Sequence, residues 1–322
     1  MAETKPSLLI TRKLTAAVEA RAARDYAVHL NDDDHLFSAD ELLARCAGVD
    51  AVLPCHSEIF SAEAVAQLPA SVRIIANHSV GTDHCDLAAL KARGVVVTNT
   101  PDVLSDATAE IAVLLMLGAA RRAVEGDRLM RTGSWDFWSP AFMVGTQITG
   151  KRLGIVGMGR VGQVMARRGR GFDMEIHYHN RSRLPADLEQ GAIYYDNAND
   201  LLANCDVLSL HCPTTPETTN FLNAERLARL PDGAIVVNTA RGALIDEAAL
   251  IAALKSGKLA AVGLDVYQTE PGGNPAFAEF DNVFMLPHIG SATFDTRDAM
   301  GFRALDNLDA YFAGREPIDR VA

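Results

Sequence analysis

A glycine-rich turn near the middle of the chain sets the strongest limit on what it can fold into. Residues 151–162 read KRLGIVGMGRVG, where an apolar stretch typical of a strand leads into a G-x-G-x-x-G turn and then into a helix-like sequence. The glycines let the backbone turn tightly and approach a pyrophosphate, which then lies at the start of the helix. This order of strand, turn and helix predicts a dinucleotide-binding fold. The turn glycines are Gly157, Gly159 and Gly162.

Short apolar runs on both sides of this turn predict two lobes of alternating strands and helices. Before residue 100 the runs are Leu8–Thr11, Ala51–Leu53, Ile74–Ala76 and Val95–Thr98. From Lys151 onward there are six, which is the strand count of a doubly wound dinucleotide-binding sheet. These six lie at Ile155, Ile176, Val207–Leu210, Ile235–Val237, Val262–Leu264 and Val283–Leu286.

The fold class that follows is α/β, with two Rossmann-like, doubly wound parallel-sheet domains and the active site in the cleft between them. We expect residues 1–100 plus 292–322 to form the substrate-binding (catalytic) domain, and residues 101–291 to form the dinucleotide-binding domain. An apolar helix over Asp106–Arg121 is the expected bridge between them, because a helix that is apolar all round must be buried. A tail helix over Thr293–Phe312 is expected to return to the first lobe.

The charge and the cysteine content exclude several classes of protein. The 322 residues carry 30 Lys and Arg against 41 Asp and Glu, and the net charge of −11 argues against nucleic acid or an anionic membrane as a partner. No apolar run approaches the roughly 18–20 residues of a membrane span. The five cysteines lack CxxC or Cys/His metal spacing, so we expect reduced thiols, no metal site and a cytoplasmic protein.

Three polar residues far apart in the sequence each follow a buried-strand pattern. Arg241 lies in VVNTARGALID, Glu270 in GLDVYQTEP and His288 in VFMLPHIGSAT. Ligands of open α/β sheets bind outside the carboxyl ends of the strands, so the three side chains are expected to meet there. An Arg can bind a carboxylate, a His can give or take a proton near neutral pH, and a Glu can orient that His. Alone, each is more often a surface or structural residue, but together they supply what reduction of a 2-keto acid needs.

The cofactor is indicated by the residues after Glu175–His179, the second expected strand of the dinucleotide-binding lobe. An NAD-binding sheet carries an acidic residue there, which binds the ribose. This chain instead has Asn180, Arg181, Ser182 and Arg183, and no carboxylate among them. We therefore expect NADP (NADPH) to be preferred over NAD, with two guanidinium groups and a hydroxyl around its 2′-phosphate. The alternative is a solvated basic turn.

Seven motifs follow one another along nearly the whole chain. They are NHSVGTDHCDL (77–87), TPDVLSDATAE (100–110), GIVGMGRVG (154–162), HCPTTPETTNFL (211–222), VVNTARGALIDEAAL (236–250), GLDVYQTEP (263–271) and LPHIGSAT (286–293). In these motifs the chain resembles the D-isomer-specific 2-hydroxyacid dehydrogenase family, and most of all its glyoxylate/hydroxypyruvate reductase branch. Formate dehydrogenases resemble this fold but have Gln where Glu270 stands, so Glu270 favours a hydroxyacid.

The resemblance implies a role for each matching residue. The family's carboxylate-binding Arg falls on Arg241, its acid/base His on His288, and the partner of that His on Glu270. The amides of Val80 and Gly81 match those with which the family holds the substrate carboxylate. The expected cofactor contacts, besides Asn180 to Arg183, are Thr108, Gly157, Gly159, Arg160, Val161, Gly162, Thr239, Asp265 and Gly290.

The expected activity is NADPH-dependent reduction of a small anionic 2-keto acid, glyoxylate or hydroxypyruvate, to glycolate or a D-2-hydroxy acid. His288 gives the proton. One alternative is a reductase of a larger 2-keto acid, of the 2-ketogluconate or phenylpyruvate type. The other is a dinucleotide-sensing binding protein, similar to the co-repressors that share this fold.

The segment GSWDFWSP at 133–140 holds both tryptophans of the chain. Two tryptophans in a short connection are unlike a freely solvated loop, and Trp is enriched at interfaces. They can also pack on their own domain. In the family that the chain resembles, this linker belongs to the dimer interface. We therefore expect a homodimer in which Trp138 borders the substrate pocket of the partner subunit.

Overall fold

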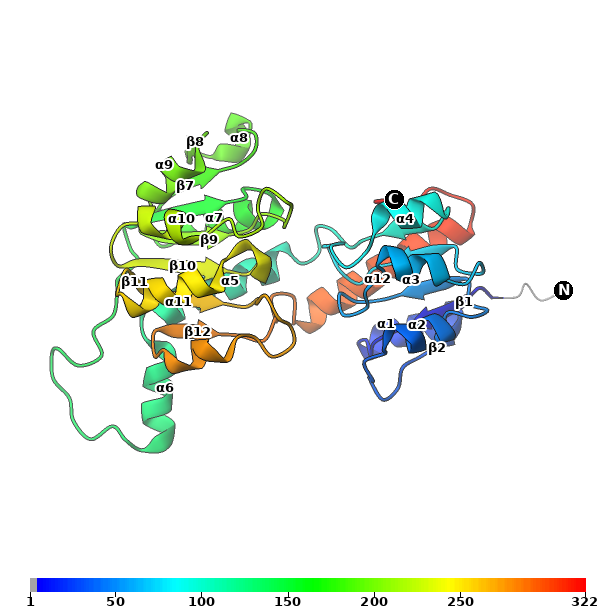
Figure 1. The fold of residues 1–322 in the computed structure, drawn as a ribbon, viewed down its shortest axis with the longest axis horizontal. Helices are drawn as coiled ribbons and strands as arrows, with labels where there is room; N and C mark the ends of the chain where they lie inside the picture. Colours follow the sequence, from blue (N-terminus) through cyan, green and yellow to red (C-terminus); the bar gives the residue numbers. More distant parts are fainter. Residues whose placement is uncertain (1–4) are drawn as a thin grey trace. The chain divides into compact units, whose positions relative to one another are not determined.

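The computed structural model describes residues 5–322 and forms two compact units. The first unit ends at Leu104 and resumes over Ser291–Ala322, and the second unit is Ser105–Gly290. Each unit has one parallel sheet with helices on its faces (Figure 1). The predicted α/β class with two parallel-sheet domains is therefore confirmed.

The sheet of the first unit has five parallel strands in the order β2-β1-β3-β4-β5. Four of them correspond to the predicted apolar runs. The other, β2, lies at the edge of the sheet with exposed Ala27 and His29, so it lacks the apolar pattern of a buried strand. The bounds are β1 (Ser7–Ile10), β2 (Ala27–His29), β3 (Ala51–Leu53), β4 (Ile74–Ala76) and β5 (Val96–Thr98).

Alternate residues of the first unit's strands enter two separate cores, one on each face of the sheet. Leu8 and Ile10 pack with Ala304 and Leu308, whereas Leu9 packs in the other cluster. The predicted tail helix is α12, which contacts β4 and α1 within this unit. The helices are α1 (Ala16–Asp25), α2 (Ala39–Arg45), α3 (Ala62–Gln67), α4 (Leu87–Ala92) and α12 (Phe294–Phe312).

The sheet of the second unit has seven parallel strands in the order β12-β11-β10-β9-β6-β7-β8. The prediction of six strands is therefore one short. The additional strand, β8, lies at the edge of the sheet, and its Ile193 is 40% exposed. It therefore lacks the apolar pattern of a buried strand. The bounds are β6 (Arg152–Val156), β7 (Glu175–His179), β8 (Ile193–Tyr195), β9 (Val207–Leu210), β10 (Ala234–Asn238), β11 (Leu259–Leu264) and β12 (Val283–Met285).

The strand order of the second unit reverses between β6 and β9, which lie side by side. Doubly wound sheets bind dinucleotides at this position, outside the carboxyl ends of the strands. The glycine-rich turn at 157–162 follows β6 directly and leads into α7 (Arg160–Arg170). The local sequence and the sheet topology thus place a dinucleotide site at the same point.

The long apolar helix is α5 (Ser105–Ala120), buried against β10, β11 and α7. A Cβ atom on Gly263 of β11 would lie 2.7 Å from the Leu115 Cβ, so glycine allows the helix to approach the strand. The other helices are α6 (Ala123–Thr132), α8 (Ala186–Glu189), α9 (Ala198–Ala203), α10 (Ala224–Arg229), α11 (Glu247–Lys255) and two 3₁₀ helices, Gly242–Leu244 and Pro275–Glu279.

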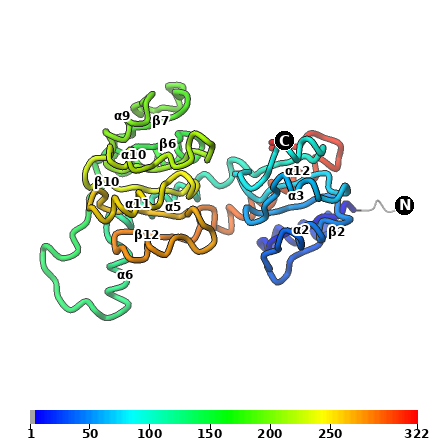
Figure 2. The backbone as a smooth tube through the Cα atoms, viewed as in Figure 1, coloured from blue at the N-terminus to red at the C-terminus, as the bar shows by residue number. Residues whose placement is uncertain are grey.

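Helix α6 and the segment 133–147 extend away from the sheet of the second unit (Figure 2). None of the described residues of α6 is buried. The aromatic side chains that follow are also exposed: Trp135 by 50%, Phe137 by 59% and Trp138 by 72%. Exposed aromatic residues in one segment are typical of a surface that binds another protein.

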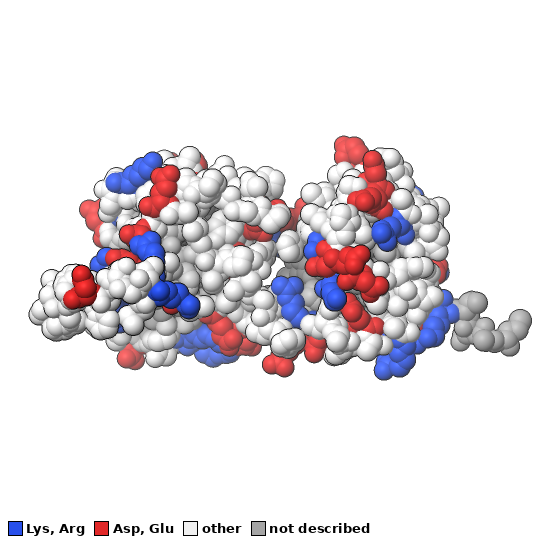
Figure 3. Space-filling model, turned by 90° about the horizontal axis from the view of Figure 1, so that it is seen from below, with Lys and Arg blue, Asp and Glu red and all other residues white. Residues whose placement is uncertain are grey.

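The surface of the described residues is charged (Figure 3), and the cysteines are unpaired with one another. On the faces that Figure 3 shows, acidic and basic side chains are interspersed. Some of them pair closely, as Arg21 of α1 does with Asp306 and Asp309 of α12, both at 2.7 Å. All five cysteines are free thiols. Among the described residues, no helix is both long enough and apolar enough to cross a membrane.

Candidate active site

Arg241, Glu270 and His288 all lie in the second unit, in the loops that follow neighbouring strands. Arg241 follows β10, Glu270 follows β11 and His288 follows β12, and these strands are adjacent and parallel. The three side chains therefore come from the same edge of the sheet, at its carboxyl end. The segments they occupy were correctly expected to be strand ends or loops.

His288 and Glu270 form a close pair. The imidazole Nδ1 lies 2.5 Å from Glu270 Oε2, and the two side chains are 29% and 24% exposed. The other carboxylate oxygen, Oε1, accepts a hydrogen bond of 2.8 Å from the Tyr267 amide. Because Glu270 is held by the backbone, it fixes the orientation of the ring. Its contact with Nδ1 leaves Nε2 as the ring nitrogen that could exchange a proton with a ligand.

Asp265 holds the backbone on which His288 stands. Its carboxylate accepts hydrogen bonds from the amides of Ile289 (2.8 Å) and Gly290 (2.7 Å). Its carbonyl oxygen accepts a third from the His288 amide, at 2.9 Å. His288 has a φ of +55°, which is unfavourable for a residue other than glycine, so these bonds stabilise a strained backbone. Asp265 is 1% exposed, and burial raises the pKa of its carboxyl although the two amides oppose the shift.

Gly290 and Thr108 lie beside this carboxylate. A Cβ atom on Gly290 would be 3.2 Å from Asp265 Oδ2 and 3.5 Å from the Thr108 side chain. Thr108 is on α5 and is 8% exposed. Three of the residues expected near the cofactor are thus gathered at one place, where space for further side-chain atoms is limited.

Arg241 is positioned by a buried amide that the sequence did not single out. The Asn238 side chain is fully buried, donates to the Arg241 carbonyl (2.8 Å) and accepts from the Ala240 amide (3.0 Å). The next residue, Gly242, packs so closely on the loop after β11 that a Cβ atom there would lie 1.8 Å from the Tyr267 carbonyl carbon. Asn238 therefore holds the Arg241 loop, and Gly242 lets this loop pack closely on Tyr267 in the Glu270 loop.

The glycine-rich turn is shaped to receive an anion. Helix α7 begins after Gly159 without a side-chain cap, which leaves the amides of its first turn for a ligand. Gly157 has a φ of +95°, and a Cβ atom there would lie 2.4 Å from the Cys212 nitrogen. A Cβ atom on Gly162 would lie 2.2 Å from the Gly157 carbonyl oxygen. Two of the three glycines are thus required sterically.

Several buried polar atoms beside this turn have no hydrogen-bond partner within the described part of the chain. They are His211 Nδ1 after β9, Thr214 Oγ1 and Thr239 Oγ1 after β10. Buried polar atoms are normally paired, so their grouping near the carboxyl ends of β9 and β10 fits a polar ligand such as a dinucleotide. Only Thr239 was named from the sequence. The motif HCPTTPETTNFL carried the signal for His211 and Thr214.

The residues after β7 differ in part from the sequence interpretation. Arg181 and Ser182 are exposed, and Asn180 Oδ1 accepts a hydrogen bond of 3.1 Å from the Met158 amide in the glycine-rich turn. Arg183, however, is paired with Glu189 through Nε (2.8 Å) and Nη2 (3.0 Å). The residues 180–183 contain no carboxylate, but α8 brings Glu189 back to this segment, so the expected pocket of two guanidinium groups without a nearby carboxylate is not what the structure shows.

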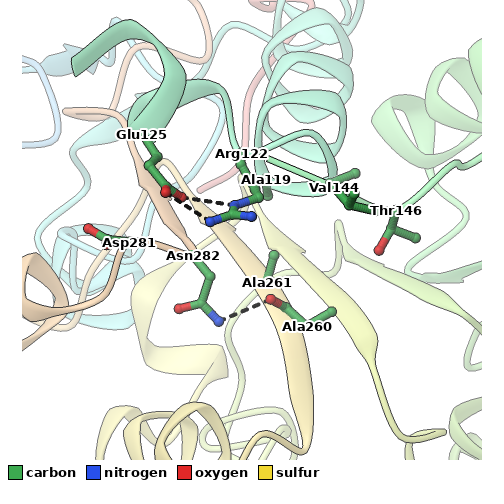
Figure 4. A pocket seen from close by; sticks show the side chains of 11 residues that line it. Ala119, Arg122, Glu125, Val144, Thr146, Ala260, Ala261, Asp281 and Asn282 are labelled. Atoms are coloured by element: carbon green, nitrogen blue, oxygen red, sulfur yellow. Dashed lines mark hydrogen bonds and ion pairs between the residues drawn. The ribbon is translucent and has the colours of Figure 1, made fainter. Parts of the chain in front are cut away.

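The second unit also has a cavity of about 350 Å³, which is not part of this arrangement (Figure 4). It is lined by Ala260 and Ala261 at the start of β11, by Asn282 before β12, and by Arg122 and Val144. It therefore lies toward the amino ends of the strands. Its charged side chains are already paired, with Arg122 bound to Glu125 at 2.8 Å and 2.9 Å.

Known proteins are similar to this chain over nearly its whole length. Residues 113–290 match the family described as D-isomer specific 2-hydroxyacid dehydrogenase, NAD binding domain. The chain belongs to this family. It is 42% identical over 315 residues to the glycerate dehydrogenase of Hyphomicrobium methylovorum, which covers 97% of this chain and 98% of that protein. It is 40% identical over 318 residues to the glyoxylate reductase of Thermococcus onnurineus, covering 97% and 95%.

A solved structure of a member of the family has the same fold. It is the NADPH-dependent glyoxylate/hydroxypyruvate reductase of Sinorhizobium meliloti in complex with NADP and malonate, with 31% identity and a TM-score of 0.87. The similarity covers 99% of this chain and 97% of that one. The resemblance inferred from the seven motifs is therefore confirmed, and the chain is a dehydrogenase of D-2-hydroxyacids by family.

Val80, Gly81 and Trp138 were also singled out by the family resemblance. Val80 and Gly81 follow β4 in the first unit, and their carbonyls accept hydrogen bonds from Asn99 (2.8 Å) and Ser79 (2.9 Å). Within the described residues, neither of the two amides donates a hydrogen bond. Trp138 lies in the exposed segment 133–147. Contact of these residues with substrate stays a prediction.

Proposed function

We propose that the protein reduces a small 2-keto acid, glyoxylate or hydroxypyruvate, with NADPH as the hydride donor. The observation that carries the proposal is the His288–Glu270 pair, held by Asp265 and lying on the same sheet edge as Arg241. A proton donor and a carboxylate-binding group are what reduction of a 2-keto acid requires beyond a hydride. Relatives named glyoxylate reductase and glycerate dehydrogenase support a substrate of this size.

The side chains divide the chemistry among them. A bound nicotinamide supplies the hydride. His288 gives a proton from Nε2 to the carbonyl oxygen of the keto acid as the carbonyl carbon is reduced. Glu270 orients the ring and stabilises the imidazolium before that transfer. Arg241 binds the substrate carboxylate, and we assign the Val80 and Gly81 amides as further hydrogen-bond donors to the same carboxylate.

The coenzyme preference is proposed from the segment after β7. Arg181 and Ser182 are exposed there, and within the described residues Arg181 makes no ion pair. A guanidinium group in this position binds a 2′-phosphate, and the Sinorhizobium meliloti reductase is NADPH-dependent. We therefore propose NADPH over NADH.

We also propose a homodimer in which the segment 133–147 lies against the partner. Its support is the exposure of Trp135, Phe137 and Trp138, which an isolated subunit leaves in water. Sedimentation at micromolar concentration tests it, and a monomer would contradict it. Replacement of Trp138 by Ala should change substrate preference in an intact dimer.

We propose a cytoplasmic location, which the five free thiols support.

A spectrophotometric assay decides between the candidate activities. NADPH oxidation is followed with glyoxylate, hydroxypyruvate, phenylpyruvate and 2-ketogluconate in turn. We expect the highest kcat/KM with glyoxylate or hydroxypyruvate. A preference for the larger acids would replace the substrate proposal, and tight NADPH binding without any turnover would indicate a dinucleotide sensor.

A further inference from the structure

The two arginines after β7 are in different situations although only one residue separates them. Arg183 directs Nε and Nη2 at the two carboxylate oxygens of Glu189, and its guanidinium lies 5.9 Å from the centre of the Tyr194 ring. Arg181 is exposed and, among the described residues, has no such partner. Arg183 directs Nε–H and one Nη2–H at Glu189, so fewer of its five donors remain for a phosphate than remain on Arg181.

Glu189 is built into the unit rather than lying loosely on its surface. It is 6% exposed, and its Oε1 also accepts a hydrogen bond of 2.6 Å from the hydroxyl of Tyr178, which is fully buried. The same hydroxyl accepts the Leu184 amide at 2.9 Å. The Glu189 carbonyl accepts a bond of 2.9 Å from Arg170 of α7. The Glu189 carboxylate is thus anchored from β7, and its main chain is anchored from α7.

The segment 180–184 is consequently held at both of its ends. Asn180 is bonded to the Met158 amide in the glycine-rich turn, and Leu184 is bonded to the Tyr178 hydroxyl. Between these points, Arg181, Ser182 and Arg183 are all exposed, and the two arginines differ in that Arg183 is paired with Glu189. Removing Arg183 from Glu189 would leave a mostly buried carboxylate without its counter-ion, which is unfavourable.

We infer that Glu189 is a positioning residue for coenzyme selection: it retains Arg183, so that Arg181 alone is the guanidinium that binds the 2′-phosphate. Arg183 then serves to neutralise Glu189, whose negative charge would otherwise repel that phosphate. This inference rests on the proposed preference for NADPH, and it replaces the expectation that both arginines bind the phosphate.

Calorimetric titration with adenosine 2′,5′-bisphosphate and with 5′-AMP measures the contribution of the 2′-phosphate without turnover. Four variants are compared with the wild type: R181A, R183Q, E189Q and R183Q/E189Q. In the E189Q variants the new carboxamide oxygen still accepts the Tyr178 hydrogen bond, and thermal unfolding of each variant checks that it is folded.

We expect R181A to bind the bisphosphate about ten- to a hundredfold more weakly, with 5′-AMP little changed. R183Q is expected to lose about three- to tenfold, because the Glu189 charge is no longer neutralised. The decisive result is the double variant, which should return to within about twofold of the wild type because both charges are gone. In E189Q, which releases Arg183, bisphosphate binding should be equal to or tighter than in the wild type.

Two outcomes would overturn the inference, and they differ from failure of the proposed function. If the wild type prefers the bisphosphate but R183Q/E189Q stays as weak as R183Q, then Arg183 binds the phosphate itself. If R181A leaves the preference intact, Arg181 is not the phosphate-binding residue. If the wild type binds both nucleotides equally, the NADPH proposal fails, and the role of Glu189 fails with it. Should R183Q prove unstable, R183A and R183A/E189Q make the same comparison.

Discussion

Two loops at the carboxyl edge of the second unit are held by a carboxylate, but in opposite ways. The catalytic loop, residues 288–290, is held by Asp265, whose carboxylate accepts hydrogen bonds from two main-chain amides of the loop. The ribose loop, residues 180–184, is tied to Glu189 through the side chains of Arg183 and Tyr178. The amide bonds to Asp265, here called the amide clamp, fix the loop backbone whatever side chains the loop carries. The hydrogen bonds to Glu189 instead depend on the identity of the side chains at 178 and 183.

The electrostatics of the two carboxylates differ accordingly. Burial raises the pKa of Asp265, and the Ile289 amide, the charge of His288 and the Gly290 amide oppose that shift. The pKa of Glu189 is lowered, chiefly by the Arg183 hydrogen bonds and then by Tyr178. The catalytic loop therefore relies on precise backbone geometry, and the ribose loop relies on charge balance. This difference separates the residues proposed to perform the chemistry from those proposed to select the coenzyme.

The largest effect is expected from His288→Ala, which removes the proton donor and leaves the ribose loop intact. General acid–base catalysis contributes roughly 10²–10⁴-fold, so kcat should fall within that range. The dissociation constant of NADPH should change little. Stopped-flow and steady-state assays of NADPH oxidation measure kcat, and fluorescence titration measures the dissociation constant of NADPH. A variant that keeps most of its activity would show that another group donates the proton.

The positions of the three proposed catalytic residues could be predicted from the sequence because each one follows an apolar strand. Arg241, Glu270 and His288 could be placed at the carboxyl edge of a sheet before their contacts were known, since parallel strands end on the same side. The glycine-rich turn could also be predicted from the sequence, because its glycines are required sterically. The close approaches of other backbone atoms to Gly157 and Gly162 show this requirement directly.

The parts that the sequence did not reveal depend on tertiary contacts. Glu189 approaches Arg183 only because a short helix turns the chain back, and Asn238 acts only because it is buried beneath the Arg241 turn. The edge strands β2 and β8 were missed since they lack the apolar pattern of a buried strand. The orphaned atoms of His211 and Thr214 have meaning only once their surroundings are known.

A smaller loss is expected from Asp265→Asn, which tests whether the amide clamp positions His288. The carboxamide oxygen can accept from one amide, but its NH₂ group faces the other donor and leaves a buried N–H unpaired, at a cost of about 1–3 kcal/mol in stability. Displacement of His288 by about 1 Å can cost up to 10²-fold in rate, so kcat should fall by about ten- to a hundredfold.

The matched control for Asp265→Asn lies in the other loop. Glu189→Gln should lower neither kcat at saturating NADPH nor the activity with NADH, because it does not touch the catalytic loop. Thermal unfolding separates loss of stability from loss of rate. An Asp265→Asn enzyme with wild-type kcat would mean that the clamp is dispensable for catalysis, and equal losses of kcat in both variants would remove the distinction between the loops.

The smallest effect concerns His211, whose side chain is held after β9 by a third kind of contact, a bond of 2.8 Å between Nε2 and the Ser209 hydroxyl. Burial lowers the pKa of His211 to about 4 in the folded protein, against about 6.5 in an unfolded chain. Between these values the unfolded state binds the proton and the folded state does not. Stability is therefore full above about pH 6.5 and declines as the pH falls toward 4.

At pH 5.5 this linkage amounts to about 1 kcal/mol of lost stability. The test compares the melting temperatures of wild type and His211→Gln, without coenzyme, at pH 7.5 and pH 5.5. His78 in the first unit also has its pKa lowered to about 4 by burial, so both proteins should lose stability on acidification. The variant should lose less, since Gln has no proton to gain. An identical loss in both proteins would show that the imidazole at 211 is already accessible to protons in the folded state.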